Sequence, residues 1–354
     1  MAVLKNNLFN YATKELSQDA FICWLCSYAL EDADKSDMEL VKCAETLVYE
    51  FMKRGIGEID DPSEIKLLMV EKQKENIDVL LTVDYLGKTY KIIVEDKIHA
   101  SEHDNQLERY KQEIANEGIE VIGIYYKTGF QSDMSVVNAA GYKVFNRQDV
   151  IELLGMCNSN KAILKDYKAY WKNFEELAQS YKMLPLDKLG DWQPVNGFYD
   201  EMFSILEEKG LWTNYGYVPN PSGGFWGLWY GIDDGSIKKG DFKATIFLQV
   251  EIKWNYDNSK YDYRICLKLK DDLDKGKDYE IGLVQSIIIE IQEEYGFSRP
   301  KHMRSGTHMT IGFFNAVDCS KTYYDLKNNI LDSVEQYKKL VGSVKESFAE
   351  KCGE

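Results

Sequence analysis

Two carboxylates and a lysine, Asp78, Glu95 and Lys97, have the types and spacing that suit binding of a divalent metal ion. They lie in two runs rich in β-branched and aromatic residues that flank Leu86-Gly87, and this pattern predicts a β-hairpin with a two-residue turn. That turn sets the register so that Asp78 lies opposite Glu95. Because side chains alternate along a strand, Lys97 shares their face, whereas Asp96 points to the other.

This set of groups suits the cleavage of phosphate esters. Mg²⁺ takes oxygen ligands, usually one or two carboxylates together with water and substrate phosphate. A lysine beside the metal can orient or help to deprotonate a water, while the metal stabilises charge on the phosphate oxygens. The three residues therefore predict hydrolysis of phosphodiester bonds.

The series Asp78…Glu95-Asp96-Lys97 resembles the D…(D/E)-x-K signature of the PD-(D/E)xK nuclease superfamily, the restriction-endonuclease-like fold. Ile77 stands where the signature has proline, a variation that many members tolerate. Gln106 and Tyr110 follow and resemble the Q-x-x-x-Y motif of the RecB-like branch. The resemblance covers about residues 8–155.

The resemblance implies a Mg²⁺- or Mn²⁺-dependent nuclease and gives each matching residue a role. Asp78 and Glu95 would bind the metal, and Lys97 would orient or activate the attacking water. Gln106 and Tyr110 would position groups around the scissile phosphate. Taken without the hairpin, these last two residues read as an ordinary surface glutamine and a half-buried tyrosine of an amphipathic helix.

Glu15 is a fourth catalytic candidate and a third metal ligand. Residues 14–30 have an apolar i, i+4 stripe that predicts a helix, on which Glu15 and Asp19 share a neighbouring face. In several families of the superfamily an acidic residue of the first helix supplements the metal site, and residues 15–21 resemble that helix. The alternative is a solvated carboxylate. Glu71 would replace Asp78 if the hairpin register differed.

Two other motifs suggest a different kind of site, one for zinc and one for redox chemistry. His99-x-x-Glu102-His103 has the spacing of an inverted zinc-peptidase motif, which needs both histidines one turn apart on a helix. Ser101 and the residues after it look like a helix start, so these histidines would straddle a boundary. Cys23-x-x-Cys26 falls in mid-helix and is best interpreted as packing.

The remaining pattern of the first half predicts helices and strands in the order of a restriction-endonuclease-like core, an α/β fold with a mixed central sheet flanked by helices. Helices are expected at residues 39–54, 102–116, 147–155 and 162–181, and strands at 65–71, 119–127 and 142–145. We assign residues 1–184 to this domain.

Residues 185–354 predict a separate α+β domain for substrate or partner recognition, with a linker at 185–194. It has helices near 197–209, 282–295 and 320–349, and strands near 225–232, 242–254, 261–269 and 308–314. The domain is rich in aromatic residues, which serve most often as core and cross-strand pairs but can also stack bases of single strands. Lys301, His302, Arg304 and His308 are candidate phosphate contacts, and Glu251-x-Lys253 is interpreted as coincidence.

Composition limits the partners. The 354 residues carry a formal net charge of −15, which argues against indiscriminate DNA coating. The seven cysteines show no disulfide-scaffold pattern, and no apolar run or leader is apparent, so we expect a soluble cytoplasmic protein. Nucleic acid, with DNA first but RNA open, is the expected partner, and a protein partner or homodimer is allowed. The rival function is a nuclease-fold scaffold that has lost turnover.

Overall fold

The computed structural model describes residues 6–102, 105–115, 119–219, 224–255, 259–272, 279–303, 306–315 and 321–352. Internal contacts divide the chain into two compact units, Met1–Glu175 and Glu176–Glu354. The division lies within helix α6 (Ala162–Gln179). The expected boundary between residues 184 and 185, and a recognition role for the second part, stay predictions.

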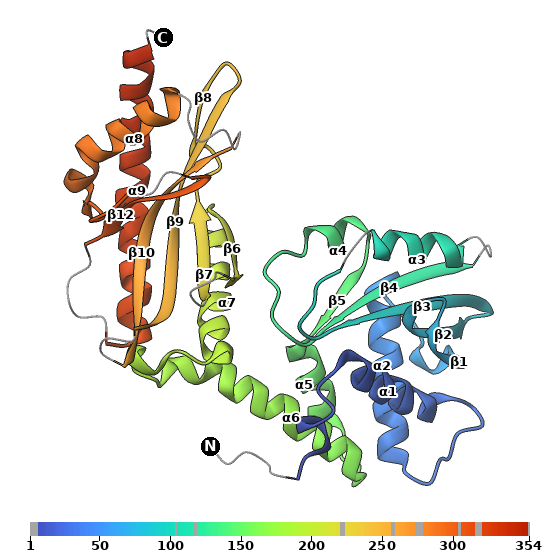
Figure 1. The fold of residues 1–354 in the computed structure, drawn as a ribbon. Coiled ribbons are helices and arrows are strands. Elements are labelled where there is room, and N and C mark those ends of the chain that lie inside the picture. Colours follow the sequence, from blue (N-terminus) through green and yellow to red (C-terminus); the bar gives the residue numbers. More distant parts are fainter. Residues whose placement is uncertain are drawn as a thin grey trace. The chain divides into compact units, whose positions relative to one another are not determined.

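The described part of the first unit contains a five-stranded mixed sheet with helices on both faces (Figure 1). In sheet order the strands are β1 (Ile65–Lys74), β2 (Ile77–Tyr85), β3 (Lys88–Lys97), β4 (Glu120–Lys127) and β5 (Lys143–Asn146). The first three strands are antiparallel, and β3, β4 and β5 are parallel. This is the predicted mixed α/β architecture.

Opposite faces of this sheet carry different helices (Figure 1). One face holds α1 (Glu15–Cys26), α2 (Met38–Ile56), α5 (Arg147–Met156) and α6, whereas the other holds α3 (Gln106–Ala115) and the short α4 (Ser135–Ala139). Phe51 of α2 packs edge-on against Tyr126 of β4, while Tyr110 of α3 packs in a cluster with Leu80 and Ile93. Because both faces are covered, β3 is buried from Ile92 through its end.

The predicted hairpin register is confirmed. Val79 pairs with Val94, and Tyr85 pairs with Lys88. Leu86 and Gly87 both have positive φ, 53° and 76°, as a type I′ turn requires. The register places the ends of β2 and β3, with their charged residues, side by side.

Helix α3 begins later than expected, at Gln106 instead of near residue 102. The segment before it is held to the sheet: Tyr125 Oη donates to Glu102 Oε2 (3.0 Å), and Lys127 Nζ donates to the Ala100 carbonyl (2.7 Å). These contacts keep residues 98–102 out of the helix, so Gln106 lies in its first turn. Asp104, which with Ser101 resembles a helix-capping start in the sequence, lies outside the described residues.

The described part of the second unit forms a seven-stranded sheet. Its strands are β6 (Trp212–Val218), β7 (Phe225–Gly231), β8 (Ser236–Lys239), β9 (Phe242–Asn255), β10 (Lys260–Asp271), β11 (Phe297–Ser298) and β12 (His308–Phe314), and its helices after α6 are α7 (Trp192–Glu208), α8 (Tyr279–Ile291) and α9 (Tyr323–Cys352). Helix α7 begins inside the predicted linker. Pro194 does not prevent this because the first helical turn needs no N–H partner.

A disulfide joins Cys43 of α2 to Cys157, the residue that ends α5. The sequence shows no disulfide-scaffold pattern, yet the structure contains this one bond. The pairing was invisible in the sequence because the partners are 114 residues apart. A cytoplasmic location stays a prediction, and persistence of the bond requires an oxidising environment. Among the described helices, none has the length and apolar character needed to cross a membrane.

Candidate active site

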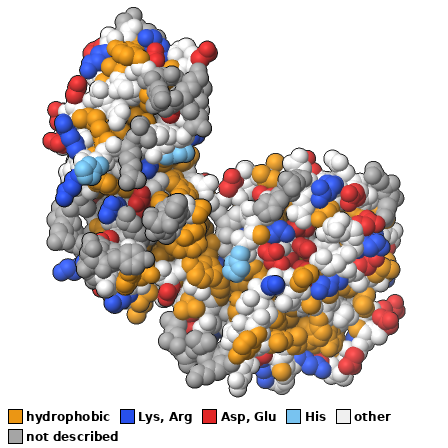
Figure 2. All heavy atoms as spheres, viewed as in Figure 1, with side chains coloured by type: hydrophobic (Ala, Val, Ile, Leu, Met, Phe, Trp, Pro, Cys, Tyr) orange, Lys and Arg blue, Asp and Glu red, His pale blue; other side chains and the backbone are white. Residues whose placement is uncertain are grey.

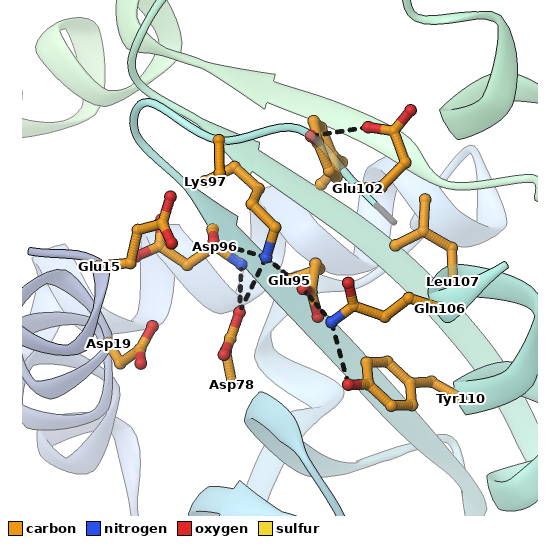
Figure 3. A network of polar contacts seen from close by, with 12 residues as sticks. Glu15, Asp19, Asp78, Glu95, Asp96, Lys97, Glu102, Gln106, Leu107 and Tyr110 are labelled. Atoms are coloured by element: carbon orange, nitrogen blue, oxygen red, sulfur yellow. Dashed lines mark hydrogen bonds and ion pairs between the residues drawn. The ribbon is translucent and has the colours of Figure 1, made fainter. Parts of the chain in front are cut away.

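Asp78, Glu95 and Lys97 converge at the open end of the hairpin (Figure 3). Lys97 Nζ forms an ion pair with Glu95 Oε1 and lies 3.8 Å from Asp78 Oδ2. The backbone N–H of Asp96 holds Asp78 in place by donating to its Oδ2 (2.9 Å). The ammonium thus lies between two carboxylates supplied by neighbouring strands.

These groups are buried to different degrees. Glu95 is fully buried and Lys97 is 8 % exposed, whereas Asp78 is half-buried. Burial, together with the nearby Asp78 carboxylate, raises the pKa of Glu95 to about 7. Burial alone would lower the pKa of Lys97, but the carboxylates of Glu95, Asp78 and Glu15 together outweigh it and the pKa is raised. Lys97 is therefore an ammonium at neutral pH, and Glu95 is close to its titration point.

Helix α3 adds Gln106 and Tyr110 to the same face. Gln106 Nε2 donates to Glu95 Oε1 (2.7 Å) and lies 2.9 Å from Tyr110 Oη. Tyr110 is 3 % exposed because its ring packs in the α3 core cluster. The glutamine is thereby held against the carboxylate from one side and the phenol from the other.

Glu15 approaches from the first turn of α1. Its Oε1 accepts a hydrogen bond from the backbone N–H of Ile98 (2.9 Å), the residue that follows Lys97. The structure therefore brings Glu15 to the end of β3, with one of its two oxygens engaged by the backbone. Its expected part in metal binding stays a prediction.

Asp19 and Gln73 were not expected at the site as functional residues. Gln73 Nε2 lies 3.1 Å from both Asp78 Oδ1 and Asp19 Oδ2, so one amide links the two carboxylates. Asp19 is 1 % exposed, and burial followed by the charge of Asp78 raises its pKa to about 6. The i, i+4 spacing from Glu15 was a signal for Asp19. Gln73 gave none, because it reads as a turn residue.

Asp96 lies on the opposite face of β3, as expected. It is fully buried, and its Oδ1 accepts a hydrogen bond from Gln18 of α1. Gln18 is held in turn by Tyr167 Oη, which donates to its Oε1 (2.9 Å). Burial raises the pKa of Asp96 well above its usual range. Asp96 contacts Asp78 through its backbone N–H, whereas its carboxyl lies on the other face of the sheet.

Lys127 is a further buried cation that the sequence did not single out. It pairs in register with Lys97 on the adjacent parallel strand and is 2 % exposed. Its ammonium donates to the carbonyls of Ile98 (3.2 Å) and Ala100 (2.7 Å). Burial lowers its pKa to about 8. Lys127 and Glu15 thus hold the peptide after Lys97 by its carbonyl and its N–H.

The alternative metal residues are placed elsewhere. His99 lies in a bend between β3 and α3, not on a helix, and His103 lies outside the described residues. The helical pair that a zinc motif needs is therefore not formed by His99. Glu71 pairs with Lys74 and Lys91, and the confirmed register removes the reason to substitute it for Asp78.

The donor set suits a hard divalent ion. Glu95 Oε2 is buried and accepts no hydrogen bond from any described residue. No group of three or more His, Cys, Asp or Glu side chains in the described ranges is arranged to hold a metal. Mg²⁺ commonly uses only one or two carboxylates and completes its shell with water and phosphate, so Asp78 and Glu95 fit it. On the visible face of the first unit, acidic side chains gather in one patch with Lys or Arg side chains beside it (Figure 2).

Comparison with known proteins gives one match. A family model described as the PD-(D/E)XK nuclease superfamily matches residues 6–182, half of the chain. No curated protein and no solved structure matches the chain. The matched range contains every residue of the candidate site.

Proposed function

The chain belongs to the PD-(D/E)XK nuclease superfamily, and on this premise we propose that it is a metal-dependent nuclease that hydrolyses phosphodiester bonds of nucleic acid. DNA is the proposed substrate. The observation that carries the proposal is the meeting of Asp78, Glu95 and Lys97 at one strand end, with the ammonium between the carboxylates.

Asp78 and Glu95 are the proposed ligands of Mg²⁺ or Mn²⁺. Bound there, the ion would stabilise negative charge that develops on the phosphate oxygens. Asp78 is held for this task by the Asp96 N–H and by Gln73, so both of its oxygens are oriented before substrate arrives. Glu95 must give up its proton to act as a ligand, because ligating carboxylates are deprotonated.

Lys97 is proposed to orient the attacking water and contact the phosphate. Its raised pKa keeps the ammonium protonated, which supports a hydrogen-bond donor instead of a base that removes the water's proton. Preorganised donors of this kind stabilise the transition state because they need no reorganisation during reaction.

Gln106 and Tyr110 are proposed as the Q-x-x-x-Y pair of a RecB-like nuclease. The bond from Gln106 Nε2 to Glu95 Oε1 supports a role in orienting this carboxylate. Glu15 is proposed to assist the metal through the oxygen that does not accept from Ile98, while its other oxygen fixes the end of β3.

The test is Mn²⁺-dependent cleavage of single-stranded DNA, duplex DNA and RNA by the wild type and by Lys97→Ala. We expect a loss of about 10²–10³-fold, the usual effect of removing one transition-state donor. Lys91→Ala is the matched control, because Lys91 lies on the same strand and binds Thr82 Oγ1 (2.9 Å). Equal cleavage by Lys97→Ala and the wild type would refute the assignment.

Calorimetric titration with Mn²⁺ separates the nuclease from the scaffold alternative. A nuclease binds the ion and loses it in Glu95→Ala, with Glu71→Ala as the control carboxylate. A scaffold has no need of the ion. A buried Glu95–Lys97 pair is weak support for stability alone, since an apolar replacement is often as stable. The superfamily match does not favour the scaffold.

A further inference from the structure

The two faces of the second sheet differ in what covers them. Helix α9 packs on one face, where Asn329 Nδ2 donates to Tyr263 Oη (3.0 Å) and Tyr230 Oη meets Ser333 Oγ (3.1 Å). Helix α7 packs on the same face, through Tyr199 and Tyr215. Tyr199, Tyr215 and Tyr230 on this side are therefore core residues, the commoner use of such side chains.

The opposite face carries two tryptophans and a phenylalanine. Trp229 pairs with Gln249, and Phe247 pairs with Lys268, which sets these four side chains on one face. Trp212 joins them, with its ring 5.9 Å from the Phe247 ring. Both indoles are half-buried, so each keeps some surface open. Hydrophobic side chains gather over β6 and β7 (Figure 2).

Glycines let these indoles lie flat against the sheet. A Cβ at Gly231 would come within 2.8 Å of the Trp212 indole, and one at Gly227 within 2.9 Å of Trp229. Trp229 is also fixed in its plane, because its Nε1–H donates to Gln249 Oε1 (2.7 Å). A ring fixed flat on a sheet presents its π-face outward.

Two cations lie along the same face of β10. Lys268 is 8 % exposed, and its Nζ donates to Thr310 Oγ1 (2.9 Å). Arg264 is exposed, and its guanidinium lies 5.8 Å from the Phe313 ring. Neither forms an ion pair within the described ranges. Glu251 pairs with Arg264 in register, but its Oε1 accepts from Gln249 Nε2 (2.7 Å).

A pocket of about 410 Å³ adjoins Arg264 and is lined by Tyr263, Ile265 and residues 313–315. This volume is within the range of small-ligand pockets. Strand β10 lies two strands from β7, about 10 Å, so the cations and the pocket run parallel to the indoles. The face therefore has aromatic side chains on β6 and β7 and an exposed cation on β10, with β9 between them.

We propose that this face binds single-stranded nucleic acid, with bases stacked on Trp212 and Trp229 and the backbone phosphate held by the exposed Arg264. Aromatic platforms beside cations are the means by which proteins bind single strands, because every base has a π-face. A duplex hides those faces in its own stack. The proposal deepens the proposed nuclease function, since such a face would select substrate.

The test measures binding without cleavage. Fluorescence anisotropy of the full chain in EDTA is titrated with a labelled oligo(dT), an oligo(U) and a DNA duplex. We expect Trp229→Leu and Trp212→Leu to weaken single-strand binding at least about fivefold, given the usual worth of one stacked base. Trp254→Leu is the matched control, because this tryptophan lies on the same sheet and is 40 % exposed.

The variant Arg264→Gln protects the test against misfolding, because Arg264 is exposed. Arg264→Gln should reduce the slope of log K against log [salt] by about 0.7, the value for one phosphate contact in a single strand. Lys339→Gln, which removes an exposed lysine of α9, should leave the slope unchanged. The relative response to oligo(dT) and oligo(U) tells which sugar is preferred.

Unchanged affinity in both tryptophan variants, or an unchanged salt slope in Arg264→Gln, would overturn the proposal. So would tighter binding of the duplex than of either single strand. None of these outcomes bears on Lys97, because EDTA suppresses metal-dependent cleavage. Failure of this inference is thereby distinguishable from failure of the nuclease proposal, which rests on cleavage by Lys97→Ala.

Discussion

Glu95 and Asp96 are adjacent at the end of β3, and each buries its carboxyl on a different face of the sheet. Different groups contact the two carboxyls. Glu95 faces α3, where an ammonium and an amide contact the same oxygen. Asp96 faces α1, where it meets Gln18 and lies close enough to Asp19 to hydrogen-bond. Both are fully buried.

The two faces differ in whether a positive charge lies beside the buried carboxyl. The Glu95 face has Lys97, a fixed cation, which lowers the pKa of Glu95 and so favours the ionised form that a metal ligand needs, while burial raises that pKa to about 7. On the Asp96 face, Asp19 Oδ1 and Asp96 Oδ2 are buried without a hydrogen-bond donor among the described residues. A proton shared between these two carboxyls would satisfy both, as happens when like charges meet in a buried site. We interpret one face as chemical and the other as structural.

The largest expected effect is on cleavage activity, and it distinguishes the Glu95 face from the Asp96 face. Glu95→Gln removes a proposed metal ligand, so Mn²⁺-dependent cleavage should fall by about 10²–10³-fold, whereas Asp96→Asn should stay within about threefold of the wild type. Asp96 is tolerant because its backbone N–H still donates to Asp78. Initial rates on one DNA substrate give both numbers. Comparable losses in the two variants would abolish the distinction between the faces.

The next effect concerns the helix layer on the Asp96 face. The Cys43–Cys157 disulfide fastens α2 to the end of α5 on this side of the sheet. Reduction should lower the free energy of unfolding by about 2–4 kcal/mol, the usual value for closing a long loop. The catalytic rate of the protein that remains folded should not change. Urea unfolding with and without dithiothreitol measures the first quantity, and Cys43→Ala, which should be insensitive to dithiothreitol, is the control.

The sequence alone predicted which residues meet on the chemical face, but it did not predict the contacts of the structural face. Alternation along the hairpin predicts that Asp78, Glu95 and Lys97 meet, because cross-strand position follows from the turn residues alone. Helical spacing likewise places Gln106 near Tyr110. These are local relations, set by strand and helix geometry. The mixed sheet followed from the same local patterns.

The remaining contacts depend on tertiary packing that local patterns do not encode. Gln18 reaches Asp96 across 78 residues, and Cys43 reaches Cys157 across 114. Gln73 lies in a positive-φ conformation, φ 53°, that aims its amide at two carboxylates, and nothing in a turn sequence indicates this. Helix α3 started late because Lys127 and Tyr125 hold the preceding segment, another pair of long-range bonds.

A smaller effect tests the proton shared on the structural face. Because burial raises the pKa of Asp96, the folded state holds this proton to higher pH than the unfolded chain does. Its contribution to stability is full below about pH 4 and declines as pH rises toward the folded pKa. Asparagine does not titrate, so Asp96→Asn should be more stable than the wild type by about 1–2 kcal/mol at pH 8, and the gain should shrink at pH 5.

Urea unfolding in EDTA at both pH values measures that gain. Asp133→Asn is the control, because the pKa of Asp133 is shifted in the opposite direction: hydrogen bonds from Ser135 lower it. This variant should not be stabilised at pH 8. A gain of equal size in both variants would attribute the effect to overall charge, and a loss in Asp96→Asn would show that the ionised carboxylate is favourable there.

The smallest expected effect lies on the chemical face, at the phenol of Tyr110. Tyr110→Phe keeps the buried ring but removes the hydroxyl that lies 2.9 Å from Gln106 Nε2. One such hydrogen bond contributes about 0.5–1.5 kcal/mol, so cleavage should fall about 2- to 10-fold, and the loss should be in kcat if Gln106 orients Glu95 for the reaction. Tyr125→Phe is the control, because Tyr125 also faces α3 but bonds to Glu102 and Gln131. If Tyr110→Phe lowered thermal stability without lowering kcat, the tyrosine would be a core residue alone, and the chemical face would end at Gln106.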